Sequence, residues 1–199
     1  LVDKLREHVT LGATATLVVI AIAVPLGTLL TRPVLRRLTP LAIAVANIGQ
    51  AIPSIGLVAF FPVVMAQIGF RPALYALVLH TALGVLRNTM VGLDQVDEAV
   101  IDAGRGMGMT KLGVLFRIEL PLAVPIILAG IRTAVVLNVG SATLGTFISA
   151  GTLGDFITIG HDLNRQPVLI TGAVLTAVLA LGIDWIAGIA ERVLRPRGL

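Results

Sequence analysis

The side chains that could do chemistry in this chain do not form a known catalytic pattern. The sequence has no Gly-x-x-x-x-Gly-Lys-Ser/Thr phosphate loop, no His-Glu-x-x-His zinc motif and no Gly-x-Ser-x-Gly nucleophile elbow. Ser141 has no evident histidine base, and His80 stands in an apolar run, which favours a packed, hydrogen-bonded histidine. Because cysteine is absent, thiolate metal ligands are excluded. We therefore expect no enzymatic activity, no metal and no cofactor bound by this chain.

The segment from Asp97 to Pro121 carries chemistry of another kind, that of a docking surface. Asp94, followed three residues later by Asp97, can cap a short helix with an apolar stripe, and Thr110 can cap a second one. Between these helices the chain is interrupted by Gly104, Gly106 and Gly108, which favour a tight reversal. The pattern predicts a helix, glycine turn, helix arrangement that could enter a groove of a partner. The alternative is an ordinary amphipathic loop lying on a membrane.

The rest of the chain has the composition of a membrane protein. Hydrophobic residues make up 56% and charged residues only 13%, and the mean hydropathy is +0.98. Long stretches lack charge entirely, and about 20 apolar residues suffice for one transmembrane helix. These stretches are 9–31, 38–70, 72–86, 133–154 and 166–183. We predict an all-α integral membrane protein, with residues 1–199 forming one transmembrane domain.

The simplest arrangement has about five passes. We expect spans at His8–Thr31, Pro40–Gln67, Ala73–Leu93, Leu120–Ser149 and Gln166–Ala190. The second charge-free run would measure about 50 Å as one straight helix, too long for one bilayer core and too short for two passes. Pro53 removes a backbone donor, so we expect one pass that is broken in mid-membrane.

Lys and Arg placement predicts the orientation. With residues 94–120 in the cytoplasm, ten basic residues lie inside and four outside, as the positive-inside rule requires. The inside set is Arg32, Arg36, Arg37, Arg87, Arg105, Lys111, Arg117, Arg192, Arg195 and Arg197, and the outside set is Lys4, Arg6, Arg71 and Arg165. We expect the N-terminus outside and the C-terminus inside. Arg132 falls within a span, where pairing with an acid is favoured over a solute contact.

The spacing in the polar segment resembles the EAA signature of ABC-importer permeases. The match consists of Asp102-Ala103-Gly104, three residues, Gly108, nine residues, Ile118, one residue and Leu120-Pro121. Asp102 replaces the Glu of the signature, and Gly104 replaces its second Ala. The resemblance implies that this segment, about residues 94–120, is a coupling helix for a cytoplasmic ATPase subunit. The implied coupling residues are Glu98, Asp102, Ala103, Gly104, Gly108, Met109, Leu120 and Pro121.

Other segments are similar to permeases of osmoprotectant importers for glycine betaine, carnitine or choline. They include Asn47 to Ser54, Arg87-Asn88-Thr89, Ala129 to Ala134 and Gly151-Thr152-Leu153-Gly154-Asp155. The resemblance implies a methionine-importer-like type I permease fold in a bacterial plasma membrane. It also implies two ATPase subunits that hold ATP and Mg²⁺, a second permease chain (identical or paralogous), an external solute-binding protein, and alternating access. Membrane lipid is a further expected partner, and nucleic acid is not expected.

Polar residues within the spans are candidates for the solute path. These are Asn47, Gln50, Pro53 and Ser54 at the break, and Asn138, Ser141 and Thr143 in the fourth span. Such residues also often make hydrogen bonds between packed helices, which leaves that alternative open. For binding-protein docking the candidates are Arg71, His161, Asp162 and Arg165, with His161 expected in an exposed loop.

The solute cannot be read from the chain, because one Trp, one Tyr and six Phe give no legible aromatic cage for a quaternary ammonium group. Two alternatives to the main interpretation remain. One is a permease for another small solute, such as an amino acid. The other is an ion-gradient-driven carrier, for which Asp184 is the only candidate intramembrane carboxylate.

Overall fold

The computed structural model describes residues 1–194, and every regular element within that range is helical. The α-helices are α1 (Val2–Leu30), α2 (Thr39–Ala51), α3 (Ser54–Met65), α4 (Phe70–Asp94), α5 (Glu98–Gly106), α6 (Lys111–Val114), α7 (Leu120–Ala142), α8 (Gly154–Asp162) and α9 (Gln166–Leu194). Short 3-10 helices cover Arg36–Leu38 and Thr143–Ile148, and a π-helical turn covers Leu115–Glu119. Arg195 and Arg197, which support the expected orientation, lie outside the described residues.

Within residues 1–194, four helical segments are long and apolar enough to cross a membrane: α1, α4, Lys111–Ile148 and α9. The fifth candidate is the pair Arg36–Ala51 and Ser54–Met65, which is bent by 101°. The break predicted at Pro53 is therefore confirmed: Ile52 and Pro53 have extended ψ values of 127° and 136° between α2 and α3. That this bent pair makes a single pass stays a prediction.

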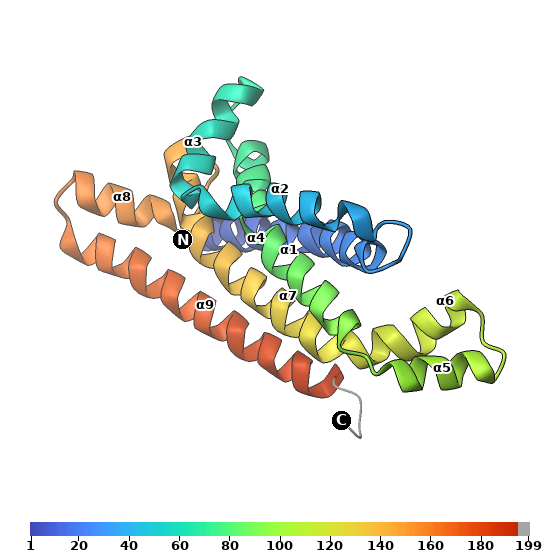
Figure 1. Cartoon of the computed structure of the whole chain (residues 1–199). Helices are drawn as coiled ribbons and strands as arrows, with labels where there is room; N and C mark the ends of the chain where they lie inside the picture. Colours follow the sequence, from blue (N-terminus) through green and yellow to red (C-terminus); the bar gives the residue numbers. More distant parts are fainter. Residues whose placement is uncertain (195–199) are drawn as a thin grey trace.

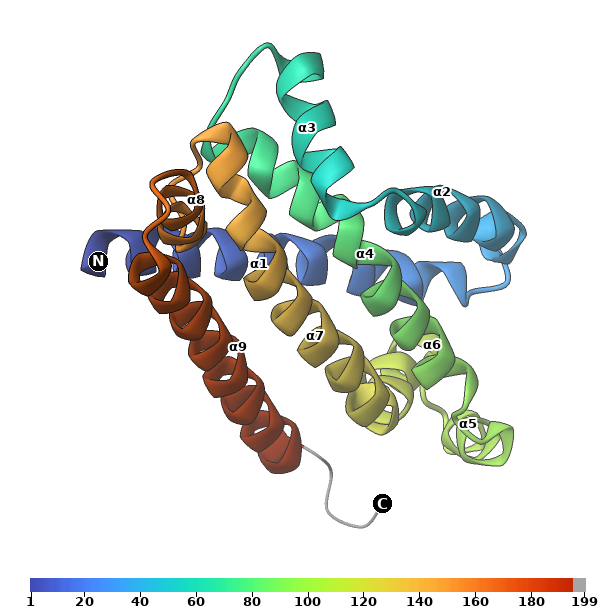
Figure 2. The same ribbon diagram turned by 90° about the vertical axis from the view of Figure 1, so that its left-hand side faces the viewer.

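The core of the bundle is formed by α1, α4 and α7 (Figures 1 and 2). α9 runs along α7 and also packs on α8, while α2 and α3 lie over α4. α5, α6 and the π-helical turn project together from one end of the bundle, and we call residues 98–119 the elbow (Figure 1). α8 lies at the opposite end. We refer to the two ends as the elbow end and the α8 end.

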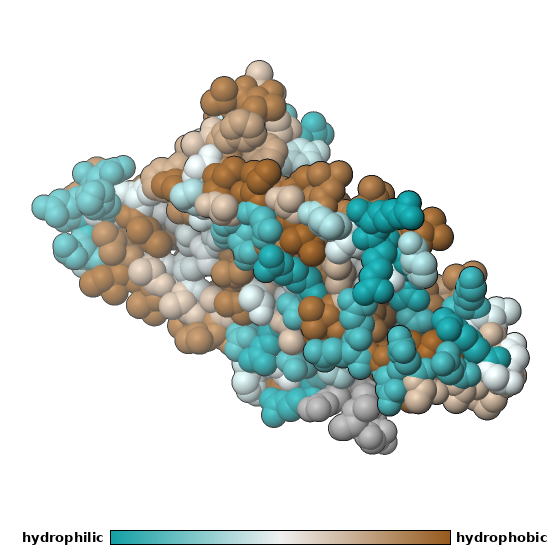
Figure 3. Space-filling view, viewed as in Figure 1, coloured by the Kyte–Doolittle hydropathy of each residue, from teal (hydrophilic) through white to brown (hydrophobic). Residues whose placement is uncertain are grey.

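Much of the molecule's outer surface is apolar. Leu17, Val63, Val178 and Leu181 are each more than 60% exposed, and Figure 3 shows broad hydrophobic areas over the outer helices. Inside, small and branched residues such as Leu11, Ala15 and Val19 are fully buried. An apolar exterior around a close-packed apolar interior is the arrangement of helices that lie in lipid.

Candidate functional site: the elbow, the broken helix and the bundle ends

The first arm of the elbow begins at an aspartate cap, Asp97. The Ala99 N–H donates to Asp97 Oδ1 at 2.8 Å, which satisfies one of the free amides at the start of α5. Glu98 lies in the first turn and Arg105 in the last, so both charges complement the helix dipole. The cap expected at Asp94 was wrong, because α4 continues through Asp94 and the cap of α5 lies three residues later.

The two glycines of the turn differ in what their positions demand. Gly108 has φ of +85°, a left-handed conformation that favours glycine. Gly104 is buried where the two arms meet, and a Cβ there would lie 2.5 Å from Ile118 Cδ1. The second arm then begins at Thr110, whose Oγ1 accepts from the Gly113 N–H at 3.1 Å. The helix, glycine turn, helix arrangement is therefore confirmed.

The structure gathers the predicted coupling residues onto the elbow and its base. Glu98, Asp102, Ala103 and Gly108 are exposed, Met109 is half-buried, and Gly104 faces inward. Leu120 and Pro121 are half-buried in the first turn of α7. Asp102 makes only an exposed contact with Arg105, at 3.4 Å. The exposed acids are accompanied by exposed apolar side chains, namely Val100, Met107, Leu112 and Phe116. A mixed apolar and charged surface on a projecting hairpin is suited to helix-in-groove docking.

One contact at the base of the elbow was not predicted from the sequence. Glu119, only 4% exposed, pairs with Arg32 at the elbow end of α1, with 2.5 Å between Oε2 and Nη2. The two residues are 87 positions apart, and no spacing rule relates them. The only available signal was a lone acid directly before the Leu120-Pro121 start of a span.

The predicted path residues fall into two separate groups. Asn47, Gln50 and Pro53 are exposed beside the break, and Asn47 Oδ1 accepts from Arg87 Nη2 at 3.0 Å. Figure 3 shows a polar area within the apolar surface, in the middle of the view. Ser54 is half-buried at the start of α3.

Asn138, in the second group, is fully buried between three helices. Its Nδ2 donates to Thr16 Oγ1 of α1 at 3.0 Å, and its Oδ1 accepts from Thr81 Oγ1 of α4 at 3.2 Å. This is the interhelical hydrogen bonding that the sequence left open as the alternative. Ser141 is half-buried, and Thr143 donates to the Gly140 carbonyl one turn earlier at 2.7 Å.

Arg132 is held by acids of α9. Its guanidinium bonds both Asp184 oxygens, at 2.6 and 2.8 Å, and reaches Glu191 at 3.3 Å. The expected structural pairing is confirmed. Asp184, the candidate carboxylate of a proton-coupled carrier, is thus engaged in a bidentate ion pair.

The α8 end carries the residues predicted to dock a binding protein. Arg71 is exposed at the start of α4, and His161, Asp162 and Arg165 are exposed around the end of α8. His161 is exposed as expected, although it lies in the last turn of α8 rather than in a loop. Lys4 of α1 bonds Asp155 of α8 at 2.8 Å.

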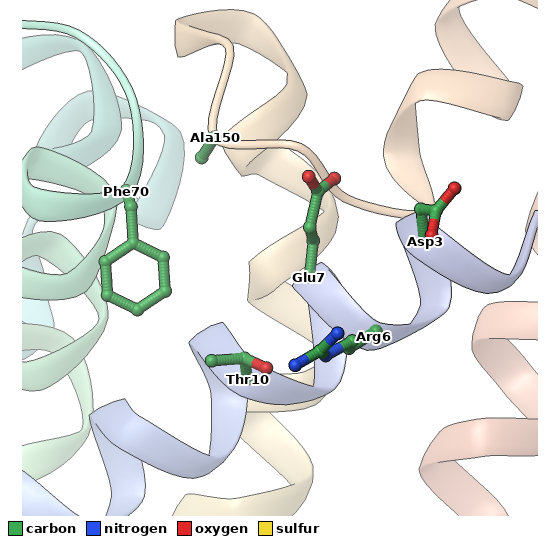
Figure 4. Close-up of a pocket in the computed structure, with 6 residues that line it drawn as sticks. All are labelled: Asp3, Arg6, Glu7, Thr10, Phe70 and Ala150. Atoms are coloured by element: carbon green, nitrogen blue, oxygen red, sulfur yellow. The ribbon is translucent and has the colours of Figure 1, made fainter.

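An open hollow of about 500 Å³ lies beside these residues (Figure 4). It is lined by Asp3, Arg6, Glu7, Thr10, Phe70 and Ala150. Figure 4 shows the four residues of α1 on one side, with Phe70 across from them and the Glu7 carboxylate turned toward the chain at Ala150. The hollow has a polar wall of both charges and one aromatic ring.

The prediction for His80 was wrong. Its Nδ1 is buried with no hydrogen-bond partner within the described residues. The packed, hydrogen-bonded histidine is instead His8: its Nε2 lies 2.9 Å from the Val139 carbonyl, and its Nδ1 accepts from the Leu153 N–H at 3.2 Å. This contact joins α1, α7 and the segment before α8. Hydropathy singled out His80 because it stands in an apolar run, whereas His8 follows Lys4, Arg6 and Glu7 and gave no such signal.

Capped arms, a buried glycine contact and a broken helix within an apolar bundle define an α-helical membrane protein with a projecting helical hairpin. Residues 11–196 match the family described as binding-protein-dependent transport system inner membrane component, and the chain belongs to that family.

Related proteins with a described transport role support this family assignment. The chain is 40% identical to the choline transport system permease protein OpuBB of Bacillus subtilis (strain 168), over 100% of this chain and 90% of that protein. It is 37% identical to the osmoprotectant import permease protein OsmY of Salmonella typhimurium, over 96% of this chain and 80% of that one. These relatives are permease subunits of transport systems.

Solved structures agree on the architecture. The inward-facing MetNI methionine ABC transporter matches with a TM-score of 0.84 and 25% identity, over 98% of this chain and 96% of that chain. An amino acid ABC transporter crystallised with histidines matches with a TM-score of 0.80 at 16% identity, over 96% of this chain and 92% of that chain, which is a likeness of fold. The chain therefore has the type I importer permease fold that the sequence predicted. It is a multi-pass membrane protein and the permease subunit of an ABC importer.

Proposed function

We propose that this permease carries a compatible solute with a quaternary ammonium group, such as choline, glycine betaine or carnitine. The observation that supports this most is the full-length similarity to permeases described by those solutes. The structure is compatible with this role, because Arg132 is neutralised by Asp184 and Glu191 and presents no free positive charge to a cation. The fully buried Asn138 side chain is occupied by interhelical hydrogen bonds. Selection of the solute therefore falls mainly to a separate binding protein.

In the orientation we propose, the elbow is cytoplasmic and the α8 end faces outward. The elbow enters a cleft in an ATPase subunit, which holds ATP and Mg²⁺, and this chain binds neither. Two ATPase subunits and a second permease chain, identical or paralogous, complete the transporter in a bacterial plasma membrane. The binding protein docks at the α8 end, where Arg71 and the His161–Arg165 segment are exposed.

The proposed mechanism is alternating access. When the ATPase subunits close on ATP, they carry the exposed elbow with them. The elbow is rigid enough to transmit this motion, because its arms are capped and meet at the buried Gly104. The movement turns the α1, α4 and α7 core and opens the path alternately to the two sides.

The docking role can be tested with one charge substitution and a matched control. Asp102→Lys places a cation on the exposed elbow, whereas Asp162→Lys makes the same change at the α8 end. We expect Asp102→Lys to abolish copurification of the ATPase subunits and solute-stimulated ATP hydrolysis. Asp162→Lys should retain copurification. Equal copurification of the ATPase with both variants would contradict the docking role.

The solute class can be tested by uptake into proteoliposomes that contain the permease, its ATPase and its binding protein. Radiolabelled choline, glycine betaine, carnitine and methionine would be compared. We expect ATP-dependent uptake of at least one quaternary ammonium solute and none of methionine. Uptake of methionine alone would refute the proposed solute class. Uptake driven by an ion gradient without the ATPase would refute the proposed energy source.

A further inference from the structure

A single ion pair connects the base of the elbow to α1. The Arg32 guanidinium pairs with Glu119 and also donates to the Thr28 carbonyl at 3.2 Å and to Thr31 Oγ1 at 3.0 Å. The Glu119 side chain is 6% exposed and that of Arg32 is 31% exposed. A carboxylate so deeply buried would lose much of its hydration without this partner. The pair is therefore a specific contact and not an incidental surface bridge.

The local helix geometry sets the position of Glu119. This residue ends the π-helical turn Leu115–Glu119, directly before α7 begins at Leu120. A π turn holds more residues than an α turn, so it changes the side of the helix on which the following side chains lie. Such single π turns occur frequently at functional sites. Here the turn lies at the junction between the elbow and a membrane-spanning helix.

The elbow is joined to the bundle in two ways that the chain itself provides. Its first arm continues from α4 and its second arm continues into α7. The elbow has no such continuity with α1. Of the ion pairs within the described residues, only Arg32–Glu119 links α1 to the elbow.

Close packing passes any movement of this end of α1 to its neighbour. Gly27 lies one turn before Arg32, and a Cβ on it would come 2.9 Å from Thr89 Cβ and 3.1 Å from the Leu86 carbonyl of α4. Helices in such close contact move together. A displacement at Glu119 would thus reach both α1 and the face of α4 against which α1 packs.

We propose that Arg32 and Glu119 are positioning residues that couple the movement of the elbow to α1. This inference rests on the proposed docking of the elbow to an ATPase subunit. When the ATPase moves the elbow, Glu119 draws the end of α1 with it directly, in addition to the movement that α1 receives through its packing against α4. Without the pair, ATP is hydrolysed but less of the movement reaches the solute path.

The test uses the complete transporter in proteoliposomes with its ATPase and binding protein, and glycine betaine and choline as probes. The variants are Glu119→Gln, Arg32→Gln, Arg32→Lys and the exchange Arg32→Glu with Glu119→Arg. Glu191→Gln is the matched control, because it removes a half-exposed acid from another ion pair while Arg132 keeps Asp184. Copurification of the ATPase, ATP hydrolysis and solute uptake per ATP are measured for each.

We expect Glu119→Gln and Arg32→Gln to keep the ATPase bound while uptake per ATP falls by about fivefold or more. A factor of about five is the lower end of typical energetic coupling between two sites. Arg32→Lys should lose less, and the charge exchange should recover part of the uptake per ATP. The control should not change this ratio. Unchanged uptake per ATP in folded Arg32→Gln or Glu119→Gln protein would overturn the inference, even if the yield of protein falls. If Glu119→Gln does not fold, the more exposed Arg32 variants decide the question.

Failure of this inference differs from failure of the proposed docking. If Asp102→Lys releases the ATPase but the Arg32 and Glu119 variants keep normal uptake per ATP, only the coupling role of the pair is wrong. If Asp102→Lys leaves ATPase binding intact, the docking role itself is wrong.

Discussion

Replacement of Asn138 by leucine should weaken the bundle only slightly and leave transport intact. Asn138 is 0% exposed and joins α7 to α1 and α4 through Thr16 and Thr81. Leucine has a similar size and removes both hydrogen bonds at once. Neither hydroxyl is left without a partner, because Thr16 also donates to the Gly12 carbonyl at 2.9 Å and Thr81 to the Leu77 carbonyl at 2.9 Å.

The size of the effect follows from these two bonds. Hydrogen bonds between membrane helices contribute about 0.6 kcal/mol each, so the pair accounts for about 1.2 kcal/mol. A loss of that size changes the folding equilibrium about eightfold. Asn138→Asp should be much worse, since it places a carboxylate with no cationic partner in the described contacts of this site.

The assay combines denaturant unfolding in detergent with uptake per folded transporter. We expect Asn138→Leu to lose about 1 kcal/mol of unfolding free energy and to retain most of its uptake. A folded Asn138→Leu protein with normal stability and a more than tenfold loss of uptake would refute the reasoning. That result would mean that the Asn138 amide contacts the solute at some stage of the cycle.

Two further predictions concern packing and charge. Gly104→Ala should be tolerated, since its Cβ most closely approaches the end of the flexible Ile118 side chain. Gly104→Val should cost about 1–3 kcal/mol of unfolding free energy by overpacking and weaken ATPase copurification. Equal unfolding and copurification for the two variants would contradict this. Arg132→Gln should lower the yield of folded protein by leaving Asp184 and Glu191 without their cation. The double variant Arg132→Gln with Asp184→Asn should recover part of that yield, measured by size-exclusion chromatography. No recovery would mean that Arg132 has another role.

The features that could be predicted from the sequence are those encoded over short distances. A cap such as Thr110 acts three residues away, and the turn at Gly108 depends on that residue's own backbone conformation. Pro53 breaks the helix for a similarly local reason. The charge-free runs indicated the spans, because a helix in lipid must make all its backbone hydrogen bonds internally and present apolar side chains to the lipid.

The contacts that could not be predicted join distant parts of the chain. Arg32 and Glu119 are separated by 87 positions, Thr16 and Asn138 by 122, and His8 and Val139 by 131. Hydropathy locates the apolar helices, but it does not specify which side of each helix meets which neighbour. The 101° bend between α2 and α3 has the same origin: proline removes the helical continuity, and tertiary packing sets the angle.

The exposed polar groups beside the broken helix indicate where the solute path lies. Asn138 and its partners are buried in the core, so a path through the α1, α4 and α7 interface would have to break their hydrogen bonds. Asn47, Gln50 and Arg87 instead lie exposed beside the broken helix, within an otherwise apolar surface. Such groups are costly in lipid and usually face protein or water-filled cavities. In the proposed assembly, this face is therefore the one that the second permease chain covers, with the solute path between the two.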